Sequence, residues 1–443
     1  MKIFIKTYGC SFNHVDSEIM AGILFKQGHS IVNVQDEADL VIINSCSVKN
    51  GSESKLFNDI NFFNENNIKF VVAGCVPQAE PGYLNTKLKN CSVIGTNNLS
   101  EIIFAVNDVL NGKIFQKLNL DINRRLNEVE RLERESKRLN IDKKRENKFV
   151  EIIPINEGCL NNCSFCKTKF ARGNLFSYSI ENIKNTMKKA LDEGVYEIWL
   201  TSQDTACYGF DLGTNLPNLL KELLTLNGDY RIRIGMGNPN HFKKIIDEVL
   251  EIMLSDNRIY KFLHIPIQSG CNRILDEMRR MYTVEDYIGI ISKIKFKIPN
   301  LTIANDIIVA YPTETFEEFR KTLEILKFSN VLNFSRFWLR PGTFVVKKYS
   351  KFDFIDGGES KKRIKEIKGK FEELALKNNS NWIGWEGEAF IVNIGKDKTE
   401  SFILRNDYYK PIIVKIKKGL KVGDKVRVRI TKVTWFDFRG EVI

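Results

Sequence analysis

The chain has 443 residues, enough for about two to four domains with a sizeable hydrophobic core. Its 43% hydrophobic and 28% charged residues are typical of a globular protein, and no apolar run is long enough for a membrane-spanning helix. The 67 Lys and Arg residues exceed the 55 Asp and Glu residues, and the net charge of +12 permits nucleic-acid binding without requiring it. The start, MKIFIKTYGC, lacks the pattern of a secretory signal, so we expect a cytoplasmic protein with no membrane partner.

Residues 1–112 alternate short apolar runs with helix-like stretches, which predicts a small parallel α/β sheet. Three of the runs, KIFIKTYGC, DLVIINSC and KFVVAGC, each end in a cysteine: Cys10, Cys46 and Cys75. Ligands of open α/β sheets bind at the carboxyl edge of the strands, so the three thiols are expected to converge there. A single buried cysteine is more often part of a core, and Cys91 is interpreted in that way.

The next segment, residues 113–148, is dense in charge and poor in aromatic residues. Its composition favours a solvated connector, either an exposed helix with i, i+4 ion pairs or a flexible linker. The whole chain has nine cysteines and no secretory signal. This argues against a disulfide framework and favours metal binding or catalysis.

Strand and helix signals return on a larger scale in residues 149–375. The strand-like runs are FVEIIPI, EIWLTS, RIRIGM, KFLHIPI, TIANDIIV and FSRFWL, with helix-like segments between them. Six such units predict a (β/α) barrel, partial or full, with chemistry at the loops that follow its strands.

The last stretch, residues 380–443, contains four short β-type runs separated by Gly and Asp turns, which predicts a small all-β barrel. Between residues 381 and 443 there are 13 Lys and Arg against 8 Asp and Glu, with several Trp and Tyr residues among them. Basic residues combined with stacking aromatic rings suit single-stranded RNA, although some of these rings must fill the barrel core.

The motif GCLNNCSFCK places Cys159, Cys163 and Cys166 just after the first barrel strand. A structural zinc site usually has four ligands, often as two Cys-x-x-Cys pairs, and only a degraded zinc knuckle would fit three close thiols. Three thiols spaced C-x3-C-x2-C, with an aromatic residue before the last, resemble the radical S-adenosylmethionine superfamily. That resemblance implies a [4Fe–4S] cluster with one open iron, where S-adenosylmethionine binds and is cleaved by one electron to a 5′-deoxyadenosyl radical.

Nearly the whole chain resembles the methylthiotransferase family within that superfamily. The segments TYGCSFNHVDSE, NSCSVK, VVAGCVPQ, LHIPIQSG, RPGT and RNDYYKPIIVK carry the resemblance. It implies that Cys10, Cys46 and Cys75 hold a second [4Fe–4S] cluster, which carries or delivers sulfur, with Asn13 and Gln78 nearby. It also implies a C–S–CH3 product and a C-terminal TRAM domain, in which Arg405, Tyr409 and Lys410 would contact RNA.

The segments GCLNNCSFCKTKFARGNLFSYS and EIWLTSQDTACYGFDLGTNLP resemble the archaeal and eukaryotic branch that acts on N6-threonylcarbamoyladenosine. That branch implies methylthiolation at C2 of adenosine 37 of tRNA, with an electron donor and a sulfur source that the sequence does not name. Methylthiolation of isopentenyladenosine in tRNA or of a ribosomal-protein aspartate is an alternative. An RNA-binding protein with structural iron–sulfur clusters is the non-enzymatic alternative.

Polar residues after the barrel strands are candidates for binding the methionine or ribose of the cofactor. They are Gln203, Gln268, Ser269, Arg336 and Arg340, and ordinary loop positions or surface ion pairs are the alternative for each. No catalytic residue is assigned from the sequence. The chain departs from the family near residue 310, where Ala310 and Thr313 replace two glycines, so the turn beside the cofactor is expected to differ in shape.

Overall fold

A computed structural model gives the fold and describes residues 1–443 except 48–50, 122, 125, 140 and 396–399. Val48 and Lys49 of the NSCSVK segment therefore lie outside the described residues. The chain divides into two compact units. The first unit comprises Met1–Asp192, Leu200–Asp204 and Tyr208–Thr214, and the second comprises Glu193–Trp199, Thr205–Cys207 and Asn215–Ile443.

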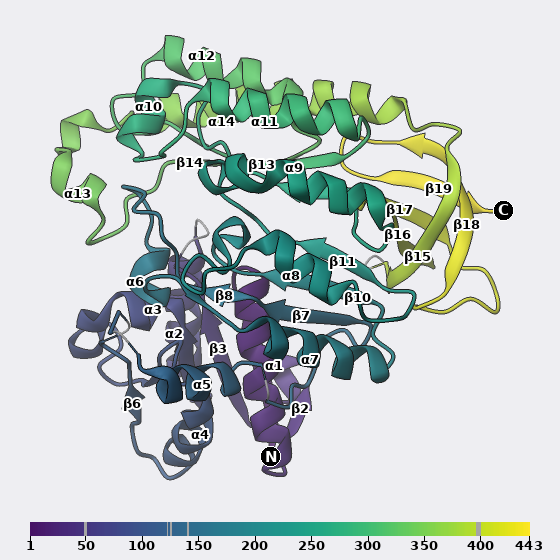
Figure 1. The fold of residues 1–443 in the computed structure, drawn as a ribbon. Coiled ribbons are helices and arrows are strands. Elements are labelled where there is room, and N and C mark those ends of the chain that lie inside the picture. The colour runs from purple at the N-terminus through teal and green to yellow at the C-terminus, as the bar shows by residue number, and fades with distance from the viewer. Residues whose placement is uncertain (48–50, 122, 125, 140, 396–399) are drawn as a thin grey trace. The chain divides into compact units, whose positions relative to one another are not determined.

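The first unit begins with a six-stranded sheet in the order β2-β1-β3-β4-β5-β6. Its strands β2, β3 and β6 are labelled in Figure 1. All adjacent strands are parallel, so their carboxyl ends share one edge, as predicted. The strands span Lys2–Thr7 (β1), Ser30–Val32 (β2), Leu40–Ser45 (β3), Phe70–Gly74 (β4), Ser92–Ile94 (β5) and Gln116–Lys117 (β6). Because β6 pairs with β5, the sheet continues past the expected domain end at residue 112.

Four helices accompany these strands: α1 (Ser11–Lys26), α2 (Ser52–Glu65), α3 (Cys75–Ala79) and α4 (Ile102–Leu110). The central strands β3 and β4 are buried along their whole length, which explains their continuous apolar sequences. Helix α1 follows β1 and buries most of its residues, including the carboxylate Asp16. Asp16 forms the buried ion pairs of the candidate functional site described below.

The connector at residues 113–148 is more buried than its composition indicates. It contains the helix α5 (Glu128–Ser136), which starts with a capping box formed by Asn127 and Glu130. Glu135, Arg138 and Leu139 at the end of this helix are each 4% exposed, so this end packs against the rest of the unit. Our expectation of a merely solvated connector was therefore wrong for this part.

The first unit continues without a break into the region expected to begin a separate barrel domain. It includes β7 (Val150–Pro154), β8 (Asn156–Glu157), α6 (Thr168–Arg172), β9 (Phe176–Ser177) and α7 (Ile180–Asp192). The predicted division near residue 149 thus does not separate two compact units, because β7 contacts α1 and α6 contacts α3.

Strands and helices then alternate as the sequence predicts. The strands are β10 (Glu197–Thr201), β11 (Arg231–Ile234), β12 (Phe262–His264), β13 (Thr302–Val309) and β14 (Val331–Arg336), so all six predicted runs form strands. The helices are α8 (Leu216–Leu223), α9 (Pro239–Ser255), α10 (Asn272–Glu277), α11 (Val284–Lys297), α12 (Phe316–Ile325), α13 (Phe344–Lys348) and α14 (Gly357–Ser380). In the second unit β12, β13 and β14 pair in parallel.

The C-terminal strands close into a small barrel in the order β15-β16-β17-β19-β18. They span Glu386–Ile394 (β15), Ser401–Asn406 (β16), Pro411–Lys415 (β17), Lys425–Val433 (β18) and Phe438–Val442 (β19). Alternating apolar residues such as Ile391, Leu404 and Val428 fill its interior. The predicted all-β barrel is confirmed, and β19 is a strand that the sequence did not predict.

The turn between β16 and β17 attaches the barrel to the strands of the second unit. The ring of Tyr409 lies 4.9 Å from that of Tyr260 and 4.8 Å from that of Phe262. The backbone N–H of Lys261 donates to the carbonyl of Asp407 at 2.7 Å. This turn is therefore a packing contact within the second unit.

This placement does not fit direct RNA contact by Arg405, Tyr409 and Lys410. The Arg405 guanidinium stacks on Tyr409 at 4.1 Å from the ring centre, and Lys410 is only 5% exposed. Burial lowers the pKa of Lys410 to about 8, which weakens it further as a phosphate-binding cation. Polar and aromatic side chains of this turn therefore contribute to attaching the barrel within the second unit.

The turn at residues 310–313 keeps a glycine-like backbone without glycine. Ala310 has φ 58° and Thr313 has φ 63°, both in the left-handed region. The Ala310 N–H donates to Glu314 at 2.7 Å, and Arg273 donates to the Thr313 carbonyl at 2.8 Å. Neighbouring polar groups thus hold a strained conformation at both positions, and a difference in turn shape from the family stays a prediction.

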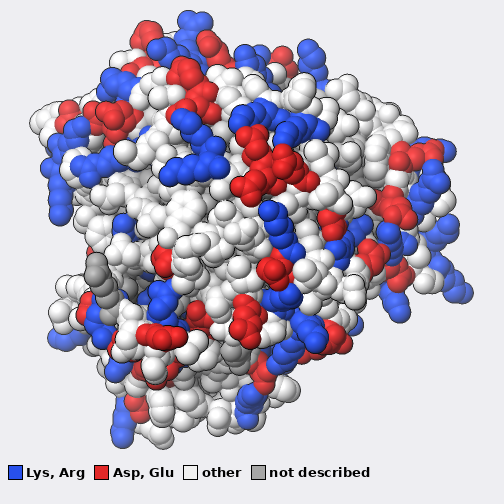
Figure 2. Space-filling model, in the orientation of Figure 1, with Lys and Arg blue, Asp and Glu red and all other residues white. Residues whose placement is uncertain are grey.

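No helix among the described residues is both long and apolar enough to cross a membrane. Figure 2 shows Lys and Arg side chains interspersed with Asp and Glu over the face drawn, rather than gathered into one basic surface. The net charge of +12 is thus not concentrated on that face.

We expect Tyr409→Ala to lower the free energy of unfolding by about 3 kcal/mol, because two ring contacts are lost from a packed interface. Phe436→Ala is the matched control, since this barrel ring is 69% exposed and its removal should leave stability unchanged. Denaturant unfolding followed by circular dichroism checks both. Unchanged stability of Tyr409→Ala with weakened RNA binding would restore the RNA-contact role.

At Thr313 we expect the glycine variant to be more stable than the alanine variant by about 1 kcal/mol, because only glycine adopts this φ without strain. Both variants lack the threonine side chain, so the difference in their stability reports the backbone conformation alone. The control is Lys365, an exposed position in α14, where Ala should be the more stable variant. If unfolding experiments showed the alanine variant to be the more stable one at position 313 as well as at position 365, the turn would carry no strain.

Candidate functional site

Three thiols of the first unit lie at the shared carboxyl edge of β1, β3 and β4. Cys10 is the N-cap of α1, Cys46 directly follows β3, and Cys75 is the first residue of α3. The backbone approaches closely at Gly9, where φ is +117° and an added Cβ would lie 2.9 Å from the Cys46 sulfur. The predicted convergence of the three loops is what the parallel register produces.

The surroundings of Cys75 show that the three thiols influence one another. Burial raises the pKa of Cys75 to about 12, Arg172 opposes this rise, and the nearby thiols of Cys46 and Cys10 add to it. A thiol whose charged form is disfavoured in the unliganded protein needs a cation, such as a metal, to become a thiolate. The site therefore suits metal coordination better than redox or nucleophilic chemistry of a free thiol.

Asn13 holds the base of this site together. Its side-chain N–H groups donate to the carbonyls of Tyr8 at 2.8 Å and Ser45 at 2.9 Å, which joins the ends of two strands. Its Oδ1 accepts from Arg172 at 3.0 Å and lies 3.5 Å from the Cys75 sulfur. The prediction that Asn13 lies near the N-terminal thiols is thus matched by its position.

Gln78 is buried on α3, and its side-chain N–H group donates to the carbonyl of Asn119 at 2.7 Å. Its Oε1 atom has no hydrogen-bond partner among the described residues and faces Gly95, whose added Cβ would lie 2.1 Å away. The contacts of Gln78 therefore tie α3 to the segment after β6. Its role beside the thiols stays a prediction.

A buried ion-pair network that the sequence did not reveal lies next to these thiols. Arg172, at the end of α6, donates to Asp16 of α1 at 2.6 Å, and Arg138, just after α5, pairs with the other oxygen of Asp16. Asp16 has no exposed side-chain surface, and the two arginines are 1% and 4% exposed. Burial alone would lower the pKa of Arg172, but Asp16 together with the thiols of Cys75 and Cys10 outweighs burial, so that pKa is raised.

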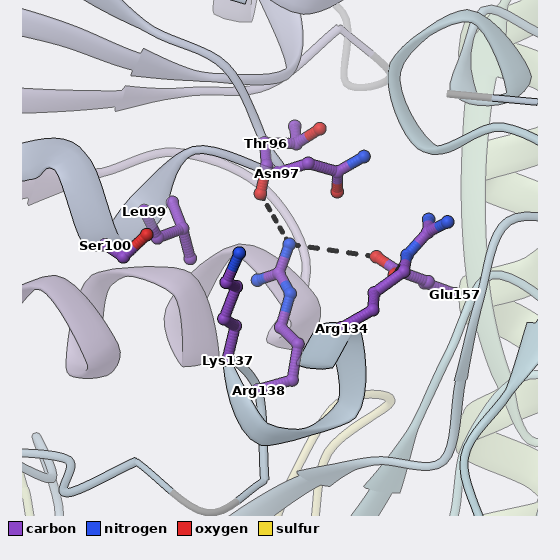
Figure 3. A pocket seen from close by; sticks show the side chains of 8 residues that line it. All are labelled: Thr96, Asn97, Leu99, Ser100, Arg134, Lys137, Arg138 and Glu157. Carbon is purple, nitrogen blue, oxygen red and sulfur yellow. Dashed lines mark hydrogen bonds and ion pairs between the residues drawn. The ribbon is translucent and has the colours of Figure 1, made fainter. Parts of the chain in front are cut away.

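Figure 3 shows the second arginine of the network from the side of a small pocket. Arg138 donates to the carbonyl of Thr96 at 2.5 Å and lies 3.8 Å from Glu157. Arg134 donates to the same Glu157 carboxylate at 2.5 Å. Through these contacts the end of the connector is fixed to both the N-terminal sheet and the segment that precedes the second group of cysteines.

The second group, Cys159, Cys163 and Cys166, lies on a loop that closes on itself. The Cys159 N–H donates to the carbonyl of Gly173 at 3.2 Å, and the Cys166 N–H donates to the carbonyl of Cys163 at 3.1 Å. Gly158 at the entrance has φ +70°, and an added Cβ would lie 1.9 Å from the carbonyl oxygen of Asn174. The loop is thus pinned at both ends.

Polar groups surround Cys159. The side-chain N–H group of Asn161 lies 3.4 Å from the Cys159 sulfur and also donates to Asp204 at 3.0 Å. Burial, followed by the charge of Asp204, raises the pKa of Cys159 to about 12. As at the N-terminal group, coordination to a metal is what would make this thiol a thiolate.

The short helix α6 brings the two groups of cysteines into one structural element. It starts two residues after Cys166 and packs on α3, where Ala171 contacts Cys75 and Ala79. Thr96 donates to the carbonyl of Ala171 at 2.7 Å. The loop that carries the second group therefore also forms a wall of the first.

Both groups fit a [4Fe–4S] cluster with one iron not bound by protein. Each offers three thiols, one fewer than the four cysteine ligands of a fully protein-bound cluster. At the N-terminal group the Nη1 atom of Arg172 is buried without a hydrogen-bond partner among the described residues. A buried guanidinium with a spare donor next to thiols fits an anionic group at that place.

The predicted cofactor-contact residues divide between the units. Gln203 belongs to the first unit with the cysteines, and its Oε1 atom is buried without a partner among the described residues. Gln268, with φ 76°, and the fully buried Ser269 follow β12 in the second unit. Arg336, which lies over Trp338, ends β14, and Arg340 follows it. Binding of one cofactor by all five stays a prediction.

Two family models match the chain. The Uncharacterized protein family UPF0004 matches residues 2–95, and the Radical SAM superfamily matches residues 153–326. The first match covers Cys10, Cys46 and Cys75, and the second covers Cys159, Cys163 and Cys166. Membership of the radical SAM superfamily implies a [4Fe–4S] cluster and S-adenosylmethionine.

The solved structure of the radical S-adenosylmethionine methyltransferase TsrM from Kitasatospora setae superposes with a TM-score of 0.52. The match covers 78% of this chain and 76% of that chain at 12% identity, and it shows a shared fold.

Curated relatives extend over the full length. A probable threonylcarbamoyladenosine tRNA methylthiotransferase of Pyrococcus horikoshii is 35% identical over 100% of both chains. The threonylcarbamoyladenosine tRNA methylthiotransferase of Homo sapiens is 38% identical over 97% of this chain and 72% of its own length. The chain belongs to the threonylcarbamoyladenosine tRNA methylthiotransferase family, and its radical SAM region makes it an enzyme of this kind.

Proposed function

We propose that the chain transfers a methylthio group to C2 of N6-threonylcarbamoyladenosine at position 37 of tRNA. The observation that carries the proposal is the pair of three-thiol sites built into one unit and joined by α6. The full-length relatives named for this tRNA substrate support the choice of nucleoside. An unidentified electron donor, a sulfur source and a cytoplasmic location complete the proposal.

Cys159, Cys163 and Cys166 would hold the cluster that binds S-adenosylmethionine, and Cys10, Cys46 and Cys75 would hold the auxiliary cluster. When bound, these groups supply one-electron cleavage of S-adenosylmethionine and a carrier for the transferred sulfur. The protein supplies the charge balance and the fixed positions around them.

The roles of the surrounding side chains follow from their contacts. Asn13 fixes the ends of β1 and β3 under the N-terminal thiols, and Arg172 places a cation beside Cys75. Asn161 orients the loop at Cys159 through its bond to Asp204. Such partners orient the groups that would bind the metal.

Exposed side chains of the C-terminal barrel are better candidates for tRNA contact than the turn at residues 405–410. The segment from the end of β17 to residue 421 exposes four lysines, and exposed rings follow β18. Lysines neutralise backbone phosphates and rings stack on unpaired bases. The residues concerned are Lys415, Lys417, Lys418, Lys421, Trp435 and Phe436.

The experiments below also test the alternative substrates and the non-enzymatic function. Isopentenyladenosine in tRNA and a ribosomal-protein aspartate would use the same two clusters, so only the product separates them. An RNA-binding protein with structural clusters would bind S-adenosylmethionine poorly and would not cleave it. The replacement of two glycines by Ala310 and Thr313 is the sequence departure that favours this last alternative, although both residues adopt a backbone conformation typical of glycine.

Replacing Cys163 by Ser should abolish cleavage of S-adenosylmethionine while the N-terminal cluster remains. Replacing Cys46 by Ser should leave cleavage intact and abolish methylthiolation, because only the sulfur carrier is lost. The control is Cys91→Ser, a buried thiol of the same unit outside both groups, which should keep about eight irons per chain and full activity. Iron analysis and 5′-deoxyadenosine formation are measured, and identical behaviour of the first two variants would contradict the assigned roles.

Nucleoside mass spectrometry decides the substrate. The reconstituted protein is incubated anaerobically with reductant, S-adenosylmethionine, a sulfur source and tRNA carrying either threonylcarbamoyladenosine or isopentenyladenosine. We expect a methylthio mass gain on the threonylcarbamoyl nucleoside alone. Cofactor cleavage without a gain on either nucleoside would contradict a tRNA substrate of these two classes.

A further inference from the structure

Arg172 differs from an ordinary buried ion-pair arginine in having a spare donor beside the thiols. Its Nη2 atom contacts Asp16 at 2.6 Å, Asn13 at 3.0 Å and the Cys75 sulfur at 3.6 Å. Its Nη1 atom is buried and has no hydrogen-bond partner among the described residues. A buried N–H group left without an acceptor is costly, so its persistence points to an acceptor that occupies this place in the working protein.

Arg138 provides an internal comparison. It pairs with the same Asp16 carboxylate, also lies over the Phe12 ring, and is equally withdrawn from solvent. Its Nη2 group donates to the Thr96 carbonyl at 2.5 Å and lies 3.8 Å from Glu157, and no contact with a thiol is found among its described partners. Asp16 is therefore paired with two arginines, and of these Arg172 is the one found in contact with a thiol.

The charges at the site indicate what the spare donor binds. Three thiolates and Asp16 would bring four negative charges against the two positive charges of the arginines, which leaves −2, and the 2+ core of an oxidised [4Fe–4S] cluster would offset that charge. Any sulfur species bound to the open iron would add negative charge in a poorly solvated place. A guanidinium is always protonated and offers N–H groups in a fixed plane, which suits such an anion.

We propose that Arg172 binds the sulfur species carried by the auxiliary cluster, with its Nη1 group donating to a small sulfur anion such as hydrosulfide or an alkanethiolate. The inference rests on the proposed function, because it requires the auxiliary cluster at Cys10, Cys46 and Cys75. The same positive charge favours the reduced state of the cluster and raises its reduction potential. Arg172 is thus a binding residue for the sulfur, and Arg138 is a structural partner.

The test uses the full chain with Cys159, Cys163 and Cys166 replaced by Ala, so that the only cluster is the auxiliary one. Electron paramagnetic resonance of the reduced cluster is followed during titration with sodium hydrosulfide and, separately, with methanethiolate. Arg172→Gln should weaken binding of both anions by at least about tenfold and lower the reduction potential. Arg138→Gln should leave the affinities and the potential unchanged, although it lowers stability.

Equal affinities and potentials in the Arg172→Gln and Arg138→Gln proteins would overturn the proposal. If Arg172→Gln does not retain about four irons per chain, Arg172→Lys takes its place, since it keeps the charge without the planar fork. Its potential should stay near that of the parent and its anion affinity should fall severalfold, and an unchanged affinity would overturn the proposal. A parent protein that holds no cluster at the N-terminal thiols would instead contradict the proposed function.

Discussion

The buried carboxylate of Asp16 is the point on which the rest of the first unit depends. It lies on α1 and receives Arg172 from α6 and Arg138 from the end of α5, so three segments far apart in sequence meet at one charge. Burying these charges is unfavourable unless each is paired, and loss of one partner from such a group costs about 3–5 kcal/mol. The pairing therefore fixes the helix that connects the two groups of thiols.

Much of the fold follows from local sequence signals. Short apolar runs that end in Gly-Cys or Ser-Cys predict strands whose carboxyl ends carry thiols, and the parallel register of β1, β3 and β4 brings Cys10, Cys46 and Cys75 to one edge. The six barrel strands and the closed C-terminal barrel are likewise visible in the alternation of apolar and polar residues. These features depend on residues within one element, which is why the sequence alone predicts them.

The remaining features depend on contacts across the chain. Arg172 and Asp16 are separated by 156 residues, and neither position stands out in composition or periodicity. Arg138 lies in a segment so rich in charge that its burial cannot be read from its neighbours. The sequence of the turn that contains Lys410 resembles an RNA-contact motif, but the turn packs within the second unit. At Ala310 and Thr313, surrounding hydrogen bonds override the intrinsic preference of the residues.

The closed loop that ends in α6 also imposes a length constraint. Arg172 follows Cys166 by six positions, and the last turn of this short helix aims its side chain at Cys75. One inserted or deleted residue would rotate that side chain by about 100° around the helix and carry it away from the thiol. The number of residues in this stretch is therefore under stricter physical constraint than most of their identities, and a change in spacing would disturb both sets of thiols at once.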